Sequence, residues 1–308
     1  MKKLTISGFV QTEQKEDEAR ELLEKLRWPN GVVCPRCMSK EIVKVVPKQG
    51  KKIRKGLYRC KNCRRLEKSS QFTVTVGTIF EDSHIKLQIW LQAVILLCSS
   101  KKGMSAHQLH RQLGITYKSA WFMAHRIRYG MQKTNKRKMQ GIIEADETLI
   151  GGKSRRVGQQ TGLENKTPVV ALVQRNGNVR SFALQTVSAK SLKAVLTENV
   201  SPKADLMTDE LAAYKKVGKE FASHEVVNHG RYEYVRGDVT TNTVEGFFAI
   251  LKRGINGVYH HVSREHLNRY LAEFNFRYNH RKIDDSARVI SAISNFEGKR
   301  LTYRDSLS

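Results

Sequence analysis

The chain has 308 residues, of which 55 are Lys or Arg and 29 are Asp or Glu, so its formal net charge is +26 at pH 7. This length allows two or three domains with a sizeable core, and the excess of positive charge favours a polyanionic partner. No stretch approaches the roughly 20 apolar residues of a membrane span, and the N-terminus lacks the apolar core of a signal peptide. We therefore expect a soluble, cytoplasmic protein with no membrane partner.

The first 80 residues contain two Cys-x-x-Cys pairs, Cys34 with Cys37 and Cys60 with Cys63. Each pair can place two thiolates on one side of a tight turn, and two such pairs make a tetrahedral zinc site. Two disulfides are the alternative, which an intracellular chain disfavours. Because four thiolates leave no open position on the metal, the pattern predicts a structural zinc ribbon over about residues 28–80.

Strand-like runs surround a basic loop inside this ribbon. We expect strands over residues 41–46 and 57–59, and a further short strand over residues 71–76. The loop would present its basic side chains to DNA phosphates. These side chains are Lys48, Lys51, Lys52, Arg54 and Lys55.

Residues 81–139 predict a helical DNA-binding segment. Apolar residues at helical spacing predict a helix over residues 83–100, with Ser83 as its N-cap and Cys98 in the core. Two further helices, within residues 105–128, are joined by a turn at Gly114. This pattern is typical of a helix-turn-helix, although an ordinary helical hairpin also fits it.

The second of these helices begins with exposed polar residues. In the DNA-reading interpretation, Tyr117, Lys118 and Ser119 contact the bases. A basic linker follows, and its side chains would bind phosphates irrespective of sequence. The linker residues are Lys133, Lys136, Arg137 and Lys138.

Residues 140–308 predict an α/β catalytic domain. The expected elements are strands over 142–146, 168–173 and 179–187, a helix over 188–199, a strand over 205–209, a helix over 210–221, a strand over 224–227 and a helix over 241–253. This order is that of the ribonuclease H-like fold, in which the first and fourth strands lie side by side. The fold class we expect is therefore α/β, with a ribonuclease H-like domain preceded by a zinc ribbon and a helix-turn-helix.

Three acidic residues occupy informative places in this domain. Asp146 ends the first strand, Asp209 ends the fourth, and Glu245 lies on the last helix. Lys252 lies seven residues after Glu245, so the two share one helix face with Asn242. A carboxylate beside an ammonium can hold a divalent metal and contact a phosphate, which indicates metal-dependent phosphoryl transfer. Solvated surface acids are the alternative interpretation.

Two further acids lie next to Asp146 on the first strand. Glu144 has the same strand parity as Asp146, so we expect that it could reach the same site. Glu147 has the opposite parity, so we expect its side chain to face away from the site.

From about Trp28 to Arg281, the chain resembles bacterial insertion-sequence transposases of the zinc-ribbon type, which have a DDE-type catalytic core and are kin to the Merlin elements. The motifs that carry this resemblance lie at residues 34–37, 72–80, 144–153, 242–254, 259–263 and 270–279. The resemblance implies a DNA transposase that binds the ends of its insertion sequence, nicks them and joins the 3′ ends to target DNA. Its partner would be double-stranded DNA, on which the chain acts as a homo-oligomer at the nucleoid.

The implied mechanism uses two Mg²⁺ or Mn²⁺ ions, in addition to the Zn²⁺ of the ribbon. Asp146 would bridge the two ions, while Asp209 and Glu245 would each hold one. Relatives use either Asn or Glu as the third side chain, and this sequence offers both Asn242 and Glu245. We favour Glu245 because Lys252 follows it as in the DDE pattern, where this lysine contacts DNA. Two other functions fit the same features: a structure-specific nuclease or resolvase, and a DNA-binding regulator with an inactive core.

Overall fold

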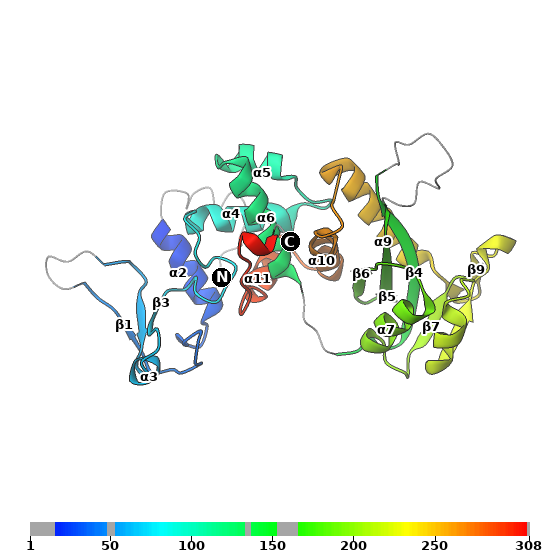
Figure 1. The fold of residues 1–308 in the computed structure, drawn as a ribbon, viewed down its shortest axis with the longest axis horizontal. Helices are drawn as coiled ribbons and strands as arrows, with labels where there is room; N and C mark the ends of the chain where they lie inside the picture. Colours follow the sequence, from blue (N-terminus) through cyan, green and yellow to red (C-terminus); the bar gives the residue numbers. More distant parts are fainter. Residues whose placement is uncertain (1–15, 48–52, 133–136, 153–165, 307–308) are drawn as a thin grey trace. The chain divides into compact units, whose positions relative to one another are not determined.

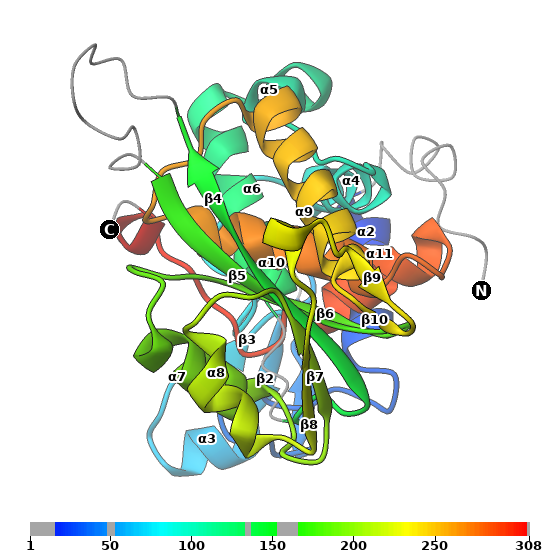
Figure 2. The same cartoon turned by 90° about the vertical axis from the view of Figure 1, so that its right-hand side faces the viewer.

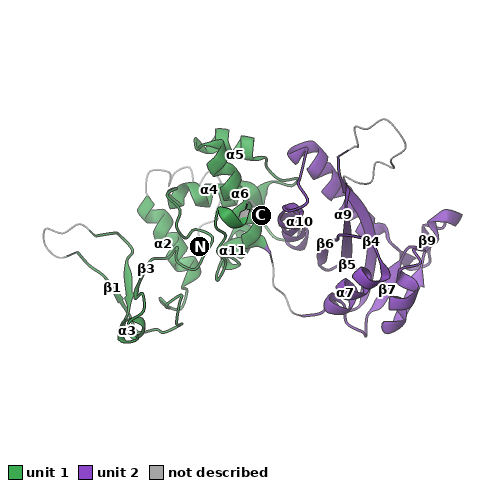
Figure 3. Ribbon diagram, in the orientation of Figure 1, with its two compact units in different colours: residues 1–131, 283–308 green, residues 132–282 purple. Residues whose placement is uncertain are grey.

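The computed structural model describes residues 16–47, 53–132, 137–152 and 166–306. The chain divides into two compact units, one formed by residues 1–131 with 283–308 and the other by residues 132–282 (Figures 1 and 3). The ribbon and the helical segment, which we expected to be separate domains, therefore lie in one unit. The last residues, which we expected to belong to the catalytic domain, join that same unit.

The first unit combines a small antiparallel sheet with helices. In chain order its elements are α2 (Glu16–Arg27), β1 (Ile42–Lys44), β2 (Tyr58–Cys60), α3 (Lys61–Arg65), β3 (Gln71–Phe72), α4 (Leu87–Ser99), α5 (Ala106–Leu113), α6 (Tyr117–Met131), α11 (Asp285–Ser294) and the 3₁₀ helix η4 (Arg304–Ser306).

The small sheet has the order β1-β2-β3 and is antiparallel throughout, as a ribbon requires. The strands that we predicted on either side of the basic loop are present, although shorter than predicted. The strand predicted over residues 71–76 ends at Phe72, after which the chain turns and the Val76 N–H donates to the Thr73 carbonyl. Phe72 is buried against Tyr58 and three of the cysteines, so the ribbon has a small core of its own.

Helix α4 begins at Leu87 instead of at Ser83, the predicted N-cap. The carboxylate of Glu16 on α2 accepts hydrogen bonds from the Leu87 and Gln88 N–H groups, at 2.9 and 3.2 Å. These N–H groups have no partner inside the helix, so a distant acid caps it. The Ser83 hydroxyl instead accepts a hydrogen bond from the Trp90 indole N–H, at 2.9 Å.

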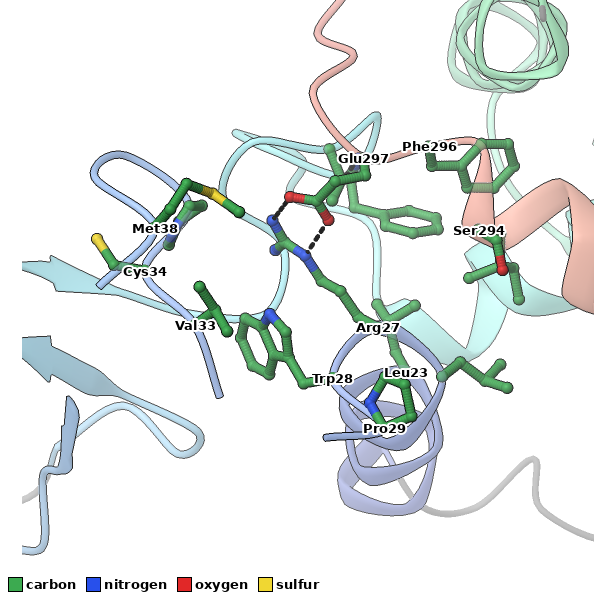
Figure 4. Close-up of a pocket in the computed structure, with 15 residues that line it drawn as sticks. Leu23, Arg27, Trp28, Pro29, Val33, Cys34, Met38, Ser294, Phe296 and Glu297 are labelled. Carbon is green, nitrogen blue, oxygen red and sulfur yellow. Dashed lines mark hydrogen bonds and ion pairs between the residues drawn. The ribbon is translucent and has the colours of Figure 1, made fainter. Parts of the chain in front are cut away.

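The C-terminal residues are tied to the first unit by an ion pair with α2. Glu297 accepts hydrogen bonds from Nε and Nη2 of Arg27, at 2.6 and 2.7 Å (Figure 4). Arg27 also lies over the Trp28 ring, 5.0 Å from its centroid. These side chains line a pocket of about 370 Å³ that also contains Cys34 and Met38 of the ribbon. The Arg27–Glu297 contact joins residues that are 270 positions apart, which no local sequence pattern reports.

The same C-terminal segment approaches helix α6 closely. A Cβ atom at Gly130 would lie 2.3 Å from the ring of Phe296, so this contact requires glycine. The ammonium of Lys299 donates to the Gly130 carbonyl at 2.7 Å. These contacts explain why residues 283–308 pack with the first unit.

The second unit is a mixed α/β structure. Its elements are β4 (Ile142–Gly151), β5 (Lys166–Gln174), β6 (Val179–Ala183), α7 (Ala189–Asn199), β7 (Asp205–Thr208), α8 (Tyr214–Val217), the 3₁₀ helix η1 (Gly218–Glu220), β8 (Ser223–Val226), the 3₁₀ helix η2 (His229–Arg231), β9 (Val235–Arg236), β10 (Val239–Thr240), α9 (Asn242–Gly254), the π-helix η3 (Ile255–Tyr259) and α10 (Leu267–Asn279).

The main sheet has the order β6-β5-β4-β7-β8. Strands β4, β5 and β6 are antiparallel, and Asn176 has a φ of 59° in the tight turn between β5 and β6. Strands β4, β7 and β8 are parallel. The first and fourth strands of this domain, β4 and β7, are therefore neighbours as predicted, and the sheet is consistent with a ribonuclease H-like core.

Helices cover both faces of this sheet, with the strands between α7–α8 and α9 (Figure 2). On one face, α7 contributes Leu192 and Leu196 to a core that includes Ile143 of β4. On the other face, α9 and α10 pack Phe247 and Phe274 against β5 and β6. Burial of strand residues on both sides holds α9, and any side chain on its first turn, at a fixed place against the sheet.

The helix predicted over residues 210–221 is shorter than predicted. It begins at Tyr214 as α8 and continues as η1 to Glu220, after a turn in which two carboxylates accept backbone hydrogen bonds. Asp209 accepts from the Leu211 N–H, and Glu210 accepts from the His229 and Gly230 N–H groups, at 2.9 and 3.0 Å.

Across the described residues, no helix combines the length and the apolar character needed to cross a bilayer.

Candidate metal sites and DNA-binding surface

The four ribbon cysteines form one cluster. Their thiols are free, and one sulfur from each residue lies within 4.8 Å of the other three. The Sγ atoms of Cys34 and Cys63 are 3.7 Å apart, and those of Cys37 and Cys60 are 3.5 Å apart. A tetrahedral zinc with Zn–S bonds of about 2.3 Å places its sulfurs about 3.8 Å apart, whereas a disulfide needs about 2.0 Å. The cluster therefore fits zinc and not two disulfides.

Asp146 and Asp209 meet at one edge of the main sheet. Asp146 lies on β4, and Asp209 directly follows the last residue of β7. Since β4 and β7 are parallel, the chain leaves β7 beside the middle of β4. One carboxylate oxygen from each of Asp146, Glu147 and Asp209 lies within 4.8 Å of the other two. The two aspartates that sequence analysis selected are thus brought together.

Glu147 belongs to this cluster, so our expectation that its side chain faces away was wrong. β7 pairs with β4 only from Ile142 to Glu144, so among the described residues no strand pairs with β4 beside Asp146 and Glu147 on the β7 side. Side chains of opposite parity can therefore converge around the open edge. The Tyr214 hydroxyl, which donates a hydrogen bond to the Glu147 carboxylate, holds it there.

The clustered carboxyls hold protons more tightly than carboxyls in water. Burial, together with the charges of Asp209 and Glu245, raises the pKa of Asp146 to about 6. Burial, together with the charges of Asp146 and Asp209, raises the pKa of Glu147 to about 7. Burial also raises the pKa of Asp209. A bound cation would offset this cost, and divalent Mg²⁺ or Mn²⁺ prefers such carboxylate oxygens.

Glu144 does not join the acid cluster, contrary to our expectation that it could reach the site. It is completely buried, and its carboxylate accepts hydrogen bonds from the Thr243 and Val244 N–H groups of α9, at 2.8 and 3.1 Å. The guanidinium of Arg175 pairs with it at 3.0 Å. Since Thr241, the N-cap of α9, makes no side-chain cap bond, Glu144 supplies the cap and anchors the helix to β4.

Glu245 lies on the first turn of α9, beside the cluster. The Thr241 hydroxyl donates to its carboxylate at 2.9 Å, and Nε2 of His229 is 3.9 Å from the same oxygen. The charge of Glu245 contributes to the raised pKa of Asp146, so the two acids lie close enough to interact. Its carboxylate is nevertheless outside the 4.8 Å group that the described residues form.

The remaining α9 candidates lie on its exposed side. Asn242 is exposed at the start of the helix, and within the described residues no hydrogen bond joins its amide to the acids. Lys252 is exposed in the last turn, next to Arg253. Both occupy the helix positions that their spacing predicted.

Sequence analysis missed His229, Tyr214 and Arg175. None belongs to a motif that we recognised, and each acts on an acid through a contact across the fold. Sequence analysis also excluded Glu147 from the site. Its position directly after Asp146 was the one available signal, and the argument from strand parity led us to discount it.

In the first unit, α5 and α6 form the predicted helical pair. α5 ends at Gly114, whose φ of 63° is left-handed, and the Thr116 hydroxyl caps α6 by accepting from the Ser119 N–H at 3.2 Å. Tyr117 is exposed but stacks on His107, with ring centroids 4.3 Å apart. The ammonium of Lys118 lies 4.7 Å from the ring centroid of Tyr303. The first turn of α6 is thus the accessible part of a helix that is buried further along.

Several basic residues that we expected to contact phosphates fall outside the described part of the chain. These are Lys48, Lys51, Lys52, Lys133 and Lys136. Of the remaining residues, Lys55 forms an ion pair with Asp17 of α2.

Comparison with known proteins finds a family match in each of the two units. Residues 138–279 match the ISXO2-like transposase domain, and residues 14–66 match the transposase zinc-ribbon domain. An uncharacterized protein in the transposable element ISH50 of Halobacterium salinarum is 28% identical over 290 residues, which cover 87% of this chain and 92% of the relative. The matched segments contain the four cysteines and the clustered acids.

Proposed function

Since the chain belongs to the insertion-sequence transposases that carry a zinc ribbon, as its motifs indicated, we propose that it binds the ends of its element, nicks them and joins the 3′ ends to target DNA. The observation that carries this proposal is the convergence of Asp146, Glu147 and Asp209 at the edge where two parallel strands adjoin, with Glu245 on the neighbouring helix. The chain would act as a homo-oligomer on DNA, in the cytoplasm at the nucleoid.

Asp146 and Asp209 would form the centre of the metal site, because both belong to the carboxylate cluster and the charge of Glu245 acts on Asp146. Glu245 would complete it from α9, and Glu147 would complete it from the opposite side of β4. When bound, two Mg²⁺ or Mn²⁺ ions would activate the attacking oxygen and stabilise the leaving oxygen of an in-line phosphoryl transfer. Asn242 would support Glu245 from the same helix face.

Other residues of this unit would orient these acids. Glu144 and Arg175 would fix the start of α9 against β4, which sets the position of Glu245 relative to Asp146. Tyr214 would hold the Glu147 carboxylate. Lys252, two turns beyond Glu245, would contact a DNA phosphate.

The first unit would supply DNA binding. Tyr117, Lys118 and Ser119 on the first turn of α6 would contact the bases, as the second helix of a helix-turn-helix does. The zinc at the four cysteines would hold the ribbon rigid and take no part in the reaction.

The test is a strand-transfer assay with the full chain, DNA that carries the ends of its element, and Mg²⁺ or Mn²⁺. We expect nicked ends and joined products from the natural chain and none from Asp209→Asn. Asp205→Asn is a matched control, because Asp205 lies on β7, the strand that precedes Asp209, but accepts a hydrogen bond from the Ser223 hydroxyl. Cleavage without joining would indicate a nuclease or resolvase, and binding without cleavage would indicate a regulator with an inactive core; either result overturns the proposal.

A further inference from the structure

A short arm formed by residues 231–240 separates β8 from α9 and exposes large side chains to solvent. Tyr232 is 85% exposed, Tyr234 is 51% exposed and Val235 is 53% exposed. Tyr232 is the most exposed large hydrophobic residue in the described part of the chain. Such a group of exposed aromatic residues on a basic protein indicates a binding surface for a partner.

This exposure does not come from a loosely held backbone. The arm contains the antiparallel pair β9–β10, and Arg236 donates to Glu225 and to the Val226 carbonyl of β8, at 2.9 and 3.3 Å. Arg175, the residue that pairs with Glu144, donates to the Asp238 carbonyl in the turn at 2.9 Å. The main sheet therefore holds the arm at two places while its tyrosines stay uncovered.

The arm also lies next to the candidate catalytic acids. The Tyr234 ring packs edge-on against the His229 ring, with centroids 5.1 Å apart. His229 in turn lies 3.9 Å from the carboxylate of Glu245 and 3.3 Å from the hydroxyl of Thr241. Two side-chain contacts thus connect an exposed aromatic ring to the proposed metal site.

The chemistry of the arm fits nucleic-acid bases better than an intact duplex. Aromatic rings stack on bases of any sequence, but only on bases that are not already stacked and paired. The arm also carries the exposed guanidinium group of Arg231, which would complement the charge of a DNA strand, whereas the guanidinium of Arg236 is paired with Glu225 and Glu233.

We propose that Tyr232 and Tyr234 form a stacking platform for unpaired bases next to the phosphate that the acid cluster cleaves. This inference rests on the proposed function, because it assigns the platform to the DNA substrate of that site. The platform would hold the opened strand end, so that the scissile phosphate stays at the acids while the neighbouring bases leave the duplex.

The experiment measures DNA binding by the full chain without metal ions, so that its result does not depend on cleavage. The probes are a single strand of about 12 nucleotides with one central 2-aminopurine, and the same strand annealed to its complement. The variants are Tyr232→Ala with Tyr234→Ala, and Tyr232→Phe with Tyr234→Phe, which keeps the rings. Val187→Ala, which alters another exposed apolar residue of the same unit, is the matched control.

We expect the double alanine variant to bind the single strand about 10-fold more weakly or worse and to lose the quenching of 2-aminopurine. Its affinity for the duplex should change little, and the double phenylalanine variant and Val187→Ala should resemble the natural chain. An unchanged single-strand affinity would overturn the inference, and so would an equal loss for both probes. Sedimentation provides a second decisive measurement: if the double alanine variant loses self-association but still binds the single strand normally, the arm contacts a second copy of the chain.

If the natural chain binds and quenches as expected but forms no strand-transfer product, the proposed function fails while the platform stands.

Discussion

Replacing Glu144 by Gln should weaken the attachment of α9 to the sheet more than the same replacement of any exposed glutamate. Glu144 is fully buried, accepts two backbone hydrogen bonds from α9 and one from the Thr243 hydroxyl, and pairs with Arg175. The glutamine side chain has nearly the same shape but no charge, and one acceptor oxygen becomes a donor. At least one N–H group would then face another donor.

The expected loss follows from these contacts. Removing one charge of a buried ion pair costs about 3–5 kcal/mol, since the other charge stays uncompensated. Arg175 retains 23% exposure of its side chain and its bond to the Asp238 carbonyl, which favours the lower end of that range. A donor left unsatisfied costs about 1–3 kcal/mol, but this overlaps with the first contribution. We therefore expect a loss of about 3–4 kcal/mol, a large part of the stability of a typical domain.

Hydrogen exchange of the full chain measures this loss of stability in the second unit, separately from the first unit. The three tryptophans, Trp28, Trp90 and Trp121, all lie in the first unit, so their fluorescence reports that unit and should not change. Peptides from residues 142–151 and 242–254 should lose protection in Glu144→Gln. Metal-dependent cleavage should fall as well, because Glu245 is no longer fixed relative to Asp146.

The matched control is Glu220→Gln, which breaks the exposed ion pair with Lys193. Such pairs contribute about 0–1 kcal/mol, so protection of α9 should stay unchanged. If Glu144→Gln lowered protection no more than Glu220→Gln does, the buried cap would not hold α9, and our account of how Glu245 is positioned would be refuted.

Three further predictions concern metals and DNA. Mass spectrometry should find one Zn²⁺ per chain, and Cys60→Ser should lose it and change Trp28 fluorescence; a metal-free, fully folded chain would contradict this. Since the raised pKa values of Asp146 (about 6) and Glu147 (about 7) mean that the metal-free folded state binds more protons than the unfolded state, these groups lower stability as pH rises from about 4 to 7. Mn²⁺ affinity should rise about 10-fold or more between pH 5.5 and 7.5 in calorimetry, because metal displaces those protons; a pH-independent affinity would count against the cluster as the metal site. Lys118→Ala combined with Tyr117→Ala should weaken binding to the element's end by about 1–3 kcal/mol and relax its sequence preference, and an unchanged footprint would indicate an ordinary helical hairpin.

Local patterns in the sequence were sufficient for much of the architecture. The spacing of Cys34, Cys37, Cys60 and Cys63 predicted one zinc cluster, since each pair is a short turn whose geometry depends on few residues. The order of strands and helices permitted the ribonuclease H-like arrangement, in which the strand of Asp146 lies beside the strand that precedes Asp209, and the two strands do pair. Turn and cap residues such as Gly114 and Thr116 fix helix ends through contacts with near neighbours in the sequence, so the predicted bounds of α5 and α6 lie close to the observed ones.

Other features depend on contacts between residues that lie far apart in the chain. Glu16 decides where α4 begins, and Glu144 caps a helix about 100 positions away. Glu147 joins the acid cluster because β7 ends early and leaves the edge of β4 open. The alternation of side chains along β4 had instead predicted that Glu147 faces away from Asp146.

The sequence alone therefore identified most of the residues that we propose as metal ligands, namely the four cysteines, Asp146 and Asp209, because metal ligands must be particular residue types at particular spacings. Only the tertiary structure decided which acids converge, what holds α9 in place, and that residues 283–308 pack with the ribbon and helices of the first unit. These outcomes depend on burial and on hydrogen bonds between distant segments, whose energies exist only once the sheet and its helices have assembled.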